Sequence, residues 1–289
     1  MRIDLHAHTT ASDGTDAPAE LVAAAALAGL DVLAVTDHDT VGGWSAALEA
    51  RPAGLTVVPG AEFSCVHVDD DGRRISLHLL GYLFDPGDEP LRAERRRLRQ
   101  SRLDRGRQMV ERMAADGIPV SWAQVSRLAA GGAVGRPHLG LALVEAGVTP
   151  DVESAFRTHL SARTPYYVRK ADMDVFTALA LIRGAGGVAV FAHPLAARRG
   201  PVVDEAVIAQ LADAGLAGLE ADHPDHDVAA RSRAHALAAD LDLVATGSSD
   251  YHGTNKPTAL GACTTTPEAF EALLAHPTAR RPVTDATAG

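Results

Sequence analysis

The sequence predicts an α/β fold, a parallel β/α barrel interrupted by a helical insertion. In the first ninety residues short apolar runs alternate with helical stretches, and this alternation resumes near Val175. Between these two parts, from about Glu89 to Val168, helix follows helix with no strand-like run before residues 166–168. We therefore expect residues 1–88 and 169–289 to form the barrel and residues 89–168 to form an inserted helical subdomain.

The expected elements alternate regularly along the barrel segments. Short apolar runs that end at polar residues predict strands at 3–5, 31–35, 56–58, 75–80, 188–192, 217–221 and 241–246. Helices are expected at 20–27, 175–184, 204–214, 228–239 and 267–275, and Gly29 is a helix stop. Such alternation indicates a largely parallel sheet, in which the carboxyl ends of the strands open on one face.

Composition indicates a soluble globular protein. The 289 residues are 46% hydrophobic and 22% charged, and the formal net charge is −10, which disfavours general binding to nucleic acid or to anionic membranes. One stretch has the opposite sign, because nine arginines stand against three acidic residues between Arg92 and Arg112. This stretch is either a solvated helix face or a rim that attracts phosphate.

Cysteine usage and the N-terminus bear on the compartment. Cys65 and Cys263 are too few for a disulfide framework, which favours a reducing environment. No apolar run approaches the roughly 18 residues of a membrane span, and no signal-peptide pattern precedes His6. We expect a cytoplasmic protein that binds no membrane and needs no obligate protein partner.

The positions of the histidines predict the chemistry. Six of the thirteen lie at or near the ends of predicted strands, together with three carboxylates; the nine residues are His6, His8, Asp13, His38, Glu62, His78, His193, Asp250 and His252. Alternate residues of a strand point the same way, so the first two histidines can bind one ion. Nine such side chains at one rim predict a metal site.

The number and type of these side chains constrain the metals. Nine nitrogen and oxygen ligands are too many for one ion of four to six coordination, so we expect two or three divalent ions. Imidazole mixed with carboxylate suits Zn²⁺, Mn²⁺ or Fe²⁺ better than Ca²⁺ or an isolated Mg²⁺. The sequence therefore predicts a metal-dependent hydrolase, and we expect a phosphoesterase.

The motifs around these residues resemble those of the PHP (polymerase and histidinol phosphatase) superfamily. They are His6-Ala7-His8-Thr9, Ser12-Asp13-Gly14, Thr36-Asp37-His38-Asp39, Pro59-Gly60-Ala61-Glu62, Ala192-His193-Pro194 and Ser249-Asp250-Tyr251-His252-Gly253. The resemblance implies a distorted seven-stranded β/α barrel with a trinuclear metal centre. The segment Gly135-Arg136-Pro137-His138 resembles the branch of small bacterial nucleotide phosphatases and trimming exoribonucleases.

The resemblance also implies a role for each ligand. His6, His8, Glu62 and Asp250 would hold a first metal. Glu62 would bridge to a second metal, held also by His78 and His193, while Asp13, His38 and His252 would hold a third. Asp4 and Asp37 would either orient the ligand imidazoles or serve the fold.

Three further residues are expected to meet the substrate. Arg136 would clamp the phosphoryl group, and His138 would protonate the leaving oxygen or bind a second phosphate. His226 is a further substrate-binding candidate, within a stretch where His223 stands at a position for which the resemblance predicts an aromatic residue.

These expectations define a reaction and its alternatives. Water bridging two ions would attack phosphate esters of nucleotides, whether 3′,5′-bisphosphates, nucleoside monophosphates or the 5′ ends of short RNA. Histidinol-phosphate phosphatase activity and a non-catalytic metal-binding regulatory module remain alternatives. An amidohydrolase would need a bridging lysine, and neither Lys170 nor Lys256 follows a barrel strand in the required place.

Overall fold

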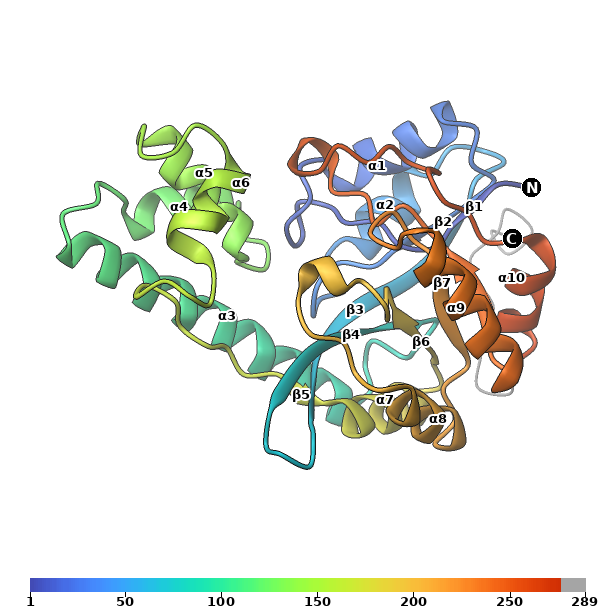
Figure 1. Cartoon of the computed structure of the whole chain (residues 1–289). Helices are drawn as coiled ribbons and strands as arrows, with labels where there is room; N and C mark the ends of the chain where they lie inside the picture. The colour runs from blue at the N-terminus through green and yellow to red at the C-terminus, as the bar shows by residue number, and fades with distance from the viewer. Residues whose placement is uncertain (277–289) are drawn as a thin grey trace.

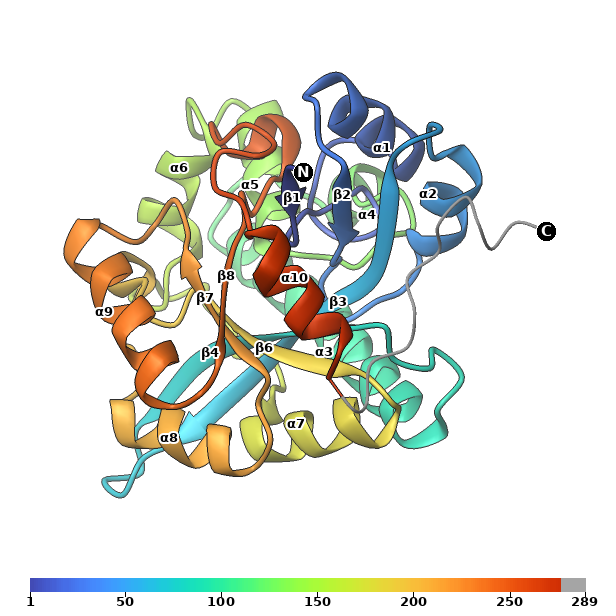
Figure 2. The same cartoon turned by 90° about the vertical axis from the view of Figure 1, so that its right-hand side faces the viewer.

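A computed structural model describes residues 1–276, and its strands form one sheet that curls into a nearly closed barrel (Figures 1 and 2). The path runs β1-β2-β3-β4-β6-β7-β8. The bounds are β1 Ile3–Asp4, β2 Val32–Val35, β3 Thr56–Val68, β4 Arg74–Tyr82, β6 Val188–Ala192, β7 Gly218–Asp222 and β8 Val244–Gly247. Pairing of Ala7 with Tyr251 joins the two ends of the path, so the expected distorted seven-stranded barrel is confirmed.

One strand departs from the expected parallel arrangement. β4 runs antiparallel to both β3 and β6, whereas the other neighbours along the path are parallel. The physical cause is the short turn after β3, where the Asp69 amide donates to the carbonyl of Arg73 and Gly72 adopts a φ of 75°. A chain that turns back within a few residues can pair only antiparallel.

The expected strand-like run at 166–168 is not a strand. The short strand in this part of the chain is β5 Met173–Asp174, which pairs in parallel with β3 outside the barrel path. The prediction was wrong because a short apolar and aromatic run fits a strand and a core contact equally well, and Tyr166 and Val168 pack against the core of the insertion.

Helices cover the barrel and close one of its ends. They are α1 Pro18–Leu27, α2 Trp44–Ala50, α7 Val175–Gly184, α8 Glu205–Asp213, α9 Val228–Asp240 and α10 Pro267–Leu274. Phe270 and Leu273 of α10 pack with Leu5, Val58 and Val188 of the barrel interior. Figure 2 shows α10 lying across this end of the barrel, with the insertion at the opposite end in Figure 1.

The insertion consists of helices joined by loops and has a core of its own. It contains α3 Glu89–Ala115, α4 Trp122–Leu128, α5 Arg136–Glu145, α6 Val152–Ala155 and a π-helical turn, Phe156–Leu160. Leu91 and Leu98 of α3 belong to the barrel's outer core, while Met109 and Met113 belong to the core of the insertion. α3 therefore spans both parts (Figure 1), and the division after residues 88 and 168 stays a prediction.

Two observations bear on the cysteines and on membranes. Cys65 is buried, Cys263 is partly buried, and both are free thiols. No helix within residues 1–276 is long and apolar enough to cross a membrane.

Candidate metal centre

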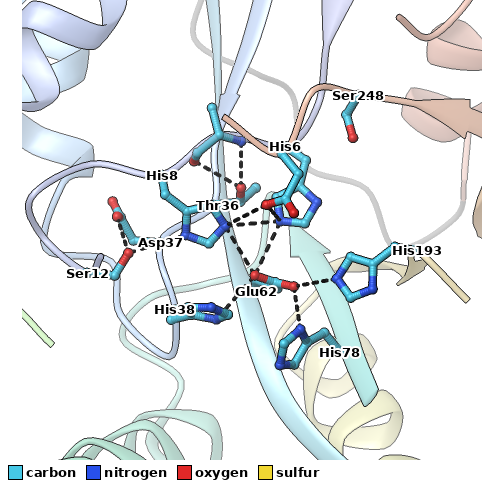
Figure 3. Close-up of polar contacts among 12 residues, drawn as sticks. His6, His8, Ser12, Thr36, Asp37, His38, Glu62, His78, His193 and Ser248 are labelled. Carbon is cyan, nitrogen blue, oxygen red and sulfur yellow. Dashed lines mark hydrogen bonds and ion pairs between the residues drawn. The ribbon is translucent and has the colours of Figure 1, made fainter. Parts of the chain in front are cut away.

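The structure brings all nine predicted ligands together at the end of the barrel that α10 leaves open. They come from loops after β1, β2, β6 and β8, and from β3 and β4 themselves. His78 lies inside β4, opposite Ser64 of β3 and beside Ala192 of β6, and reaches this rim from the middle of its strand. Figure 3 shows the imidazoles gathered around Glu62.

The first group has the shape of a four-coordinate site. The Nε2 atoms of His6 and His8 lie 3.1 Å apart, and they lie 3.3 and 3.1 Å from Oε2 of Glu62. Oδ1 of Asp250 lies 3.4 and 3.5 Å from the same two nitrogens. Four tetrahedral donors each about 2.0–2.1 Å from one zinc ion would be about 3.4 Å apart. The spacing of these four atoms fits such an ion.

The other oxygen of Glu62 faces a different pair of histidines. Its Oε1 atom lies 2.6 Å from Nδ1 of His78 and 3.0 Å from Nε2 of His193. The two carboxylate oxygens therefore face different donor sets, which is the arrangement expected of a bridging ligand. Burial alone would raise the pKa of Glu62, but the imidazoles, His78 first, hold it well below its usual value.

The third group surrounds Asp13. Oδ1 of Asp13 lies 3.4 Å from Nδ1 of His8 and 3.6 Å from Nε2 of His252, and Oδ2 lies 3.7 Å from Nε2 of His38. His38 also approaches Glu62, with Nδ1 3.1 Å from Oε2. His38 thus approaches both Asp13 and the Glu62 oxygen that faces the first group, whereas the resemblance placed it in the third group alone.

Several donor atoms are left without a hydrogen bond. Oδ1 of Asp13, Nδ1 of His38 and Nδ1 of His78 are buried and make no hydrogen bond within the described chain. Each of the three nevertheless lies close to another donor atom of the cluster, at 3.4 Å from Nδ1 of His8, 3.1 Å from Oε2 of Glu62 and 2.6 Å from Oε1 of Glu62, respectively. Buried polar atoms are ordinarily satisfied by hydrogen bonds, so close contacts without hydrogen-bond geometry favour a shared cation. Burial also lowers the pKa of His193 and His252 to about 3, which keeps both in the neutral form that binds metals. The cluster fits divalent metal ions.

Glu220 supports this cluster and was missed by the sequence reasoning. It lies fully buried on β7, and its Oε1 accepts from Nδ1 of His6 at 3.0 Å while its Oε2 accepts from the His193 amide at 2.6 Å. Ser248 also donates to it. A carboxylate behind a ligand imidazole fixes the tautomer and the ring orientation. The sequence feature that could have identified Glu220 is an acidic residue inside an otherwise apolar strand.

The two aspartates expected behind the ligands act through other groups. Asp37 accepts from the hydroxyl of Ser12 at 2.6 Å, and Ser12 lies 3.3 Å from Nδ1 of His8. Within residues 1–276, Asp4 makes no hydrogen bond to an imidazole; its Oδ1 accepts from the amide of Ser249 at 3.0 Å and more distantly from that of His6. Asp4 therefore positions the backbone that carries the ligands.

The second oxygen of Asp250 is held by cations. Arg199 and Lys256 donate to Oδ2 at 2.5 and 2.7 Å, and Nε2 of His223 lies 3.3 Å away. This arrangement leaves Oδ1 to face His6 and His8. Lys256 therefore contacts a candidate ligand but does not bridge two of the groups, and Lys170 pairs instead with Asp172.

Two candidate ligands have unusual backbone conformations. His193 has a φ of 35° and Asp250 a φ of 51°, a region that non-glycine residues seldom adopt. His193 directly follows β6, and Asp250 lies shortly after the end of β8. At both places the chain must turn sharply to point the side chain at the rim. Such strain persists where surrounding contacts enforce it, as Glu220 does by accepting from the His193 amide.

Arg136 and His138 lie at the start of α5, beside Asp13. A Cβ added to Gly135 would come within 3.5 Å of the Asp13 side chain, so the helix start lies against the metal cluster. His138 accepts from the Gly135 amide through Nδ1, and burial lowers its pKa. Arg136 donates to the carbonyl of Leu160 at 3.1 Å. No contact of either side chain with the nine ligands is seen among the described residues.

His226 contacts the backbone through both ring nitrogens, and its expected role in substrate binding stays a prediction. Its Nδ1 lies 2.9 Å from the carbonyl of Ala221, and its Nε2 accepts from the amide of Leu195 at 3.1 Å. Both ring nitrogens are therefore engaged with backbone, and the side chain is buried. His226 ties the loop after β6 to the loop after β7. Sequence could not show this, because a histidine in a polar loop looks the same in either role.

Comparisons with known proteins agree with this geometry. The PHP domain family matches residues 4–120. The chain is 34% identical to the 3′,5′-nucleoside bisphosphate phosphatase of Chromobacterium violaceum, over 86% of this chain and 87% of that protein. It is 36% identical to the 5′-3′ exoribonuclease Rnm of Salmonella typhimurium, over 66% and 64%. A Bifidobacterium adolescentis structure assigned as a metal-dependent phosphoesterase superposes with a TM-score of 0.90 at 35% identity, covering 96% of each chain. The chain belongs to the PHP family.

Proposed function

We propose that this protein is a metal-dependent phosphoesterase that removes phosphate from nucleotides, with a nucleoside 3′,5′-bisphosphate as the substrate class that fits best. The observation that carries the proposal is the carboxylate of Glu62, whose two oxygens face separate sets of histidines at one rim. The relative named as a 3′,5′-nucleoside bisphosphate phosphatase, which matches nearly the whole chain, supports the substrate class.

The nine clustered residues would hold two or three divalent ions of manganese, iron or zinc. When bound, such ions lower the pKa of a water ligand and neutralise phosphate oxygens. The residues of the chain provide the orientation: Glu220 fixes the ring of His6, and the cations on Asp250 keep one of its oxygens toward the rim. His138, beside Asp13, would give a proton to the leaving oxygen, and Arg136 would bind phosphate.

The arginine-rich helix favours a small substrate over a long oligonucleotide. Arg92 and Arg96 pair with Glu89, and Arg97 pairs with Glu94. Arg95, Arg102 and Arg105 are buried. Much of the positive charge of α3 is therefore neutralised or covered, and few of these arginines can follow an extended phosphate backbone.

A substrate panel tests the proposal. The metal-reconstituted protein is assayed with nucleoside 5′-monophosphates, 3′,5′-bisphosphates, short 5′-phosphorylated RNA, histidinol phosphate and a minimal aryl phosphate. We expect the highest kcat/KM for a bisphosphate. A preference for histidinol phosphate would contradict the nucleotide assignment, and no turnover on any substrate with metals bound would favour the non-catalytic alternative.

The variant Arg136→Ala tests how the insertion contributes to specificity. Losing a charge-assisted contact to phosphate costs about 1.5–3 kcal/mol, so KM for a bisphosphate should rise roughly ten- to a hundredfold. KM for the aryl phosphate should change little. Steady-state kinetics on both substrates decide, and equal losses on both would place Arg136 in the chemical step or in folding.

A further inference from the structure

The buried face of α3 changes character where the barrel meets the insertion. Leu91 and Leu98 pack into the barrel's outer core, and Met109 and Met113 pack into the core of the insertion. Between Leu98 and Met109, at the same helical spacing, the buried side chains are those of Arg102 and Arg105, beside the buried Gly106. A helix that only joined two apolar cores would carry apolar residues there, so the two charges need an explanation.

Arg102 has its partners within the barrel. Its Nε donates to Asp39 at 2.7 Å, and its Nη2 donates to the hydroxyl of Ser64 at 2.6 Å. Asp39 directly follows the candidate ligand His38 and also accepts from the amide of Ser64 at 2.8 Å. Arg102 thus fixes α3 against the metal rim, and its own charge is compensated.

Arg105 lies one helical turn further along and has no such partner. It is 5% exposed, it makes no hydrogen bond or ion pair with any residue in the 1–276 range, and its Nε atom is buried and unsatisfied. Burial, with Arg102 and Arg136 nearby, lowers its pKa to about 9, so it is still charged at neutral pH. A buried charge without a partner is strongly unfavourable, which is why such groups are normally paired.

Arg136 brings a second guanidinium to the same region. Its side chain donates to the carbonyl of Leu160 and lies over the rings of Phe156 and Tyr167, at 5.1 and 5.8 Å. These contacts hold the side chain without neutralising it, because none of them is with a carboxylate. Two uncompensated arginines therefore lie near each other between α3 and α5, beside the helix start that touches Asp13.

We propose that Arg105, together with Arg136, binds the phosphate group of the substrate that is not cleaved. Arg105 lies about one helical turn, or about 5 Å along α3, from Arg102, which contacts the metal rim. A phosphate dianion there would supply the counter-charge that Arg105 lacks and would take bidentate hydrogen bonds. The inference rests on the proposed nucleotide phosphoesterase function and names the residue that selects a bisphosphate over a monophosphate.

The test compares Arg105→Met with Arg99→Met, which removes the same charge from an exposed position of the same helix. In the metal-reconstituted enzyme, Arg105→Met should raise KM for a nucleoside 3′,5′-bisphosphate at least tenfold and leave KM for an aryl phosphate within about twofold. Arg99→Met should change neither. An unchanged KM for the bisphosphate, or an equal rise for both substrates, overturns the proposal.

A binding measurement separates this inference from the proposed function. Adenosine 3′,5′-bisphosphate should raise the Tm of the metal-free wild-type protein, and the shift should be lost in Arg105→Met but kept in Arg99→Met. Without ligand, Arg105→Met should not lower Tm, because it removes an unpaired buried charge; a marked fall would show a structural role and overturn the proposal. If Arg105→Met does not fold, Arg105→Lys takes its place in the test. An unchanged KM of Arg105→Lys for the bisphosphate would then overturn the proposal. Absence of turnover in the wild type would contradict the function alone.

Discussion

Glu62 is the residue on which the arrangement of the metal rim depends most. One of its oxygens lies near His6, His8 and His38, and the other lies near His78 and His193. These side chains lie at loop ends or on β3 and β4, and none of them belongs to the hydrophobic core clusters of the described residues. Their loss should therefore affect chemistry more than folding.

We expect Glu62→Gln and His193→Ala each to lower kcat by orders of magnitude while the far-ultraviolet circular dichroism spectrum is kept. The matched control is His235→Ala, which removes an exposed imidazole that pairs with Asp222. Kinetics and metal content are measured together. A near wild-type rate for either variant with the same metal content would show that the bridge is assigned to the wrong residues.

Glu220 offers a test of positioning without direct contact to metal. Glu220→Gln keeps the shape of the side chain but removes the charge that faces Nδ1 of His6. Because such supporting carboxylates raise the basicity of ligand imidazoles, metal affinity should fall roughly ten- to a hundredfold. Competition titration with a chelator measures it. Unaltered metal affinity would mean that Glu220 positions the backbone of His193 and not the ring of His6.

At the scale of elements, α3 and the β3–β4 hairpin shape the site. The hairpin turns β4 antiparallel and presents His78 from inside a strand, where a parallel strand would have presented a loop residue. α3 crosses from the barrel to the insertion and is anchored at its middle by the buried pair of Arg102 and Asp39. That pair links the insertion to the loop that carries His38.

Breaking the buried pair should destabilise the fold. Arg102→Met leaves Asp39 buried without its partner, which is expected to cost about 3–5 kcal/mol of unfolding free energy. Asp39→Asn removes the charge, and asparagine tolerates the positive φ of 55° that Asp39 adopts. In urea denaturation the double variant should lose less stability than the sum of the two single variants. Additive losses would mean that the two side chains do not interact.

At the scale of the whole molecule, segments from both ends of the chain share one charged cluster. We expect the purified and reconstituted protein to hold two or three transition-metal ions per chain. Without these cations, the three carboxylates of the cluster would repel each other. Elemental analysis measures the stoichiometry. A value of about one, with activity unaffected by chelators, would contradict a multinuclear centre.

Proton competition predicts how metal binding depends on pH. Burial opposes the charge on His8, but Asp250 and Glu62 outweigh it and raise the pKa of His8 from 6.5 to about 9 in the metal-free protein. The charged form stabilises the metal-free fold fully below pH 6.5, and this contribution is lost as pH rises through about 9. Because metal binding must displace this proton, apparent affinity should increase from pH 6.5 to 8.5. Chelator competition across this range tests it, and a flat profile would contradict it.

The sequence by itself determined the fold class, the positions of most barrel elements and the set of side chains at the rim. This was possible because strand periodicity and the two-residue spacing of His6 and His8 are local properties, and parallel strands bring their carboxyl ends to one face. The helices at Val175–Gly184 and Val228–Asp240, for example, follow from local patterns alone.

Only the tertiary structure decided which groups support that rim. Glu220 behind His6, the cations on Asp250 and the backbone role of His226 depend on contacts between residues far apart in the chain. Likewise, the sequence showed Arg105 only as one arginine among nine. Whether a charge is solvated, paired or buried alone is set by the surfaces packed around it, and no local pattern in the chain encodes those surfaces.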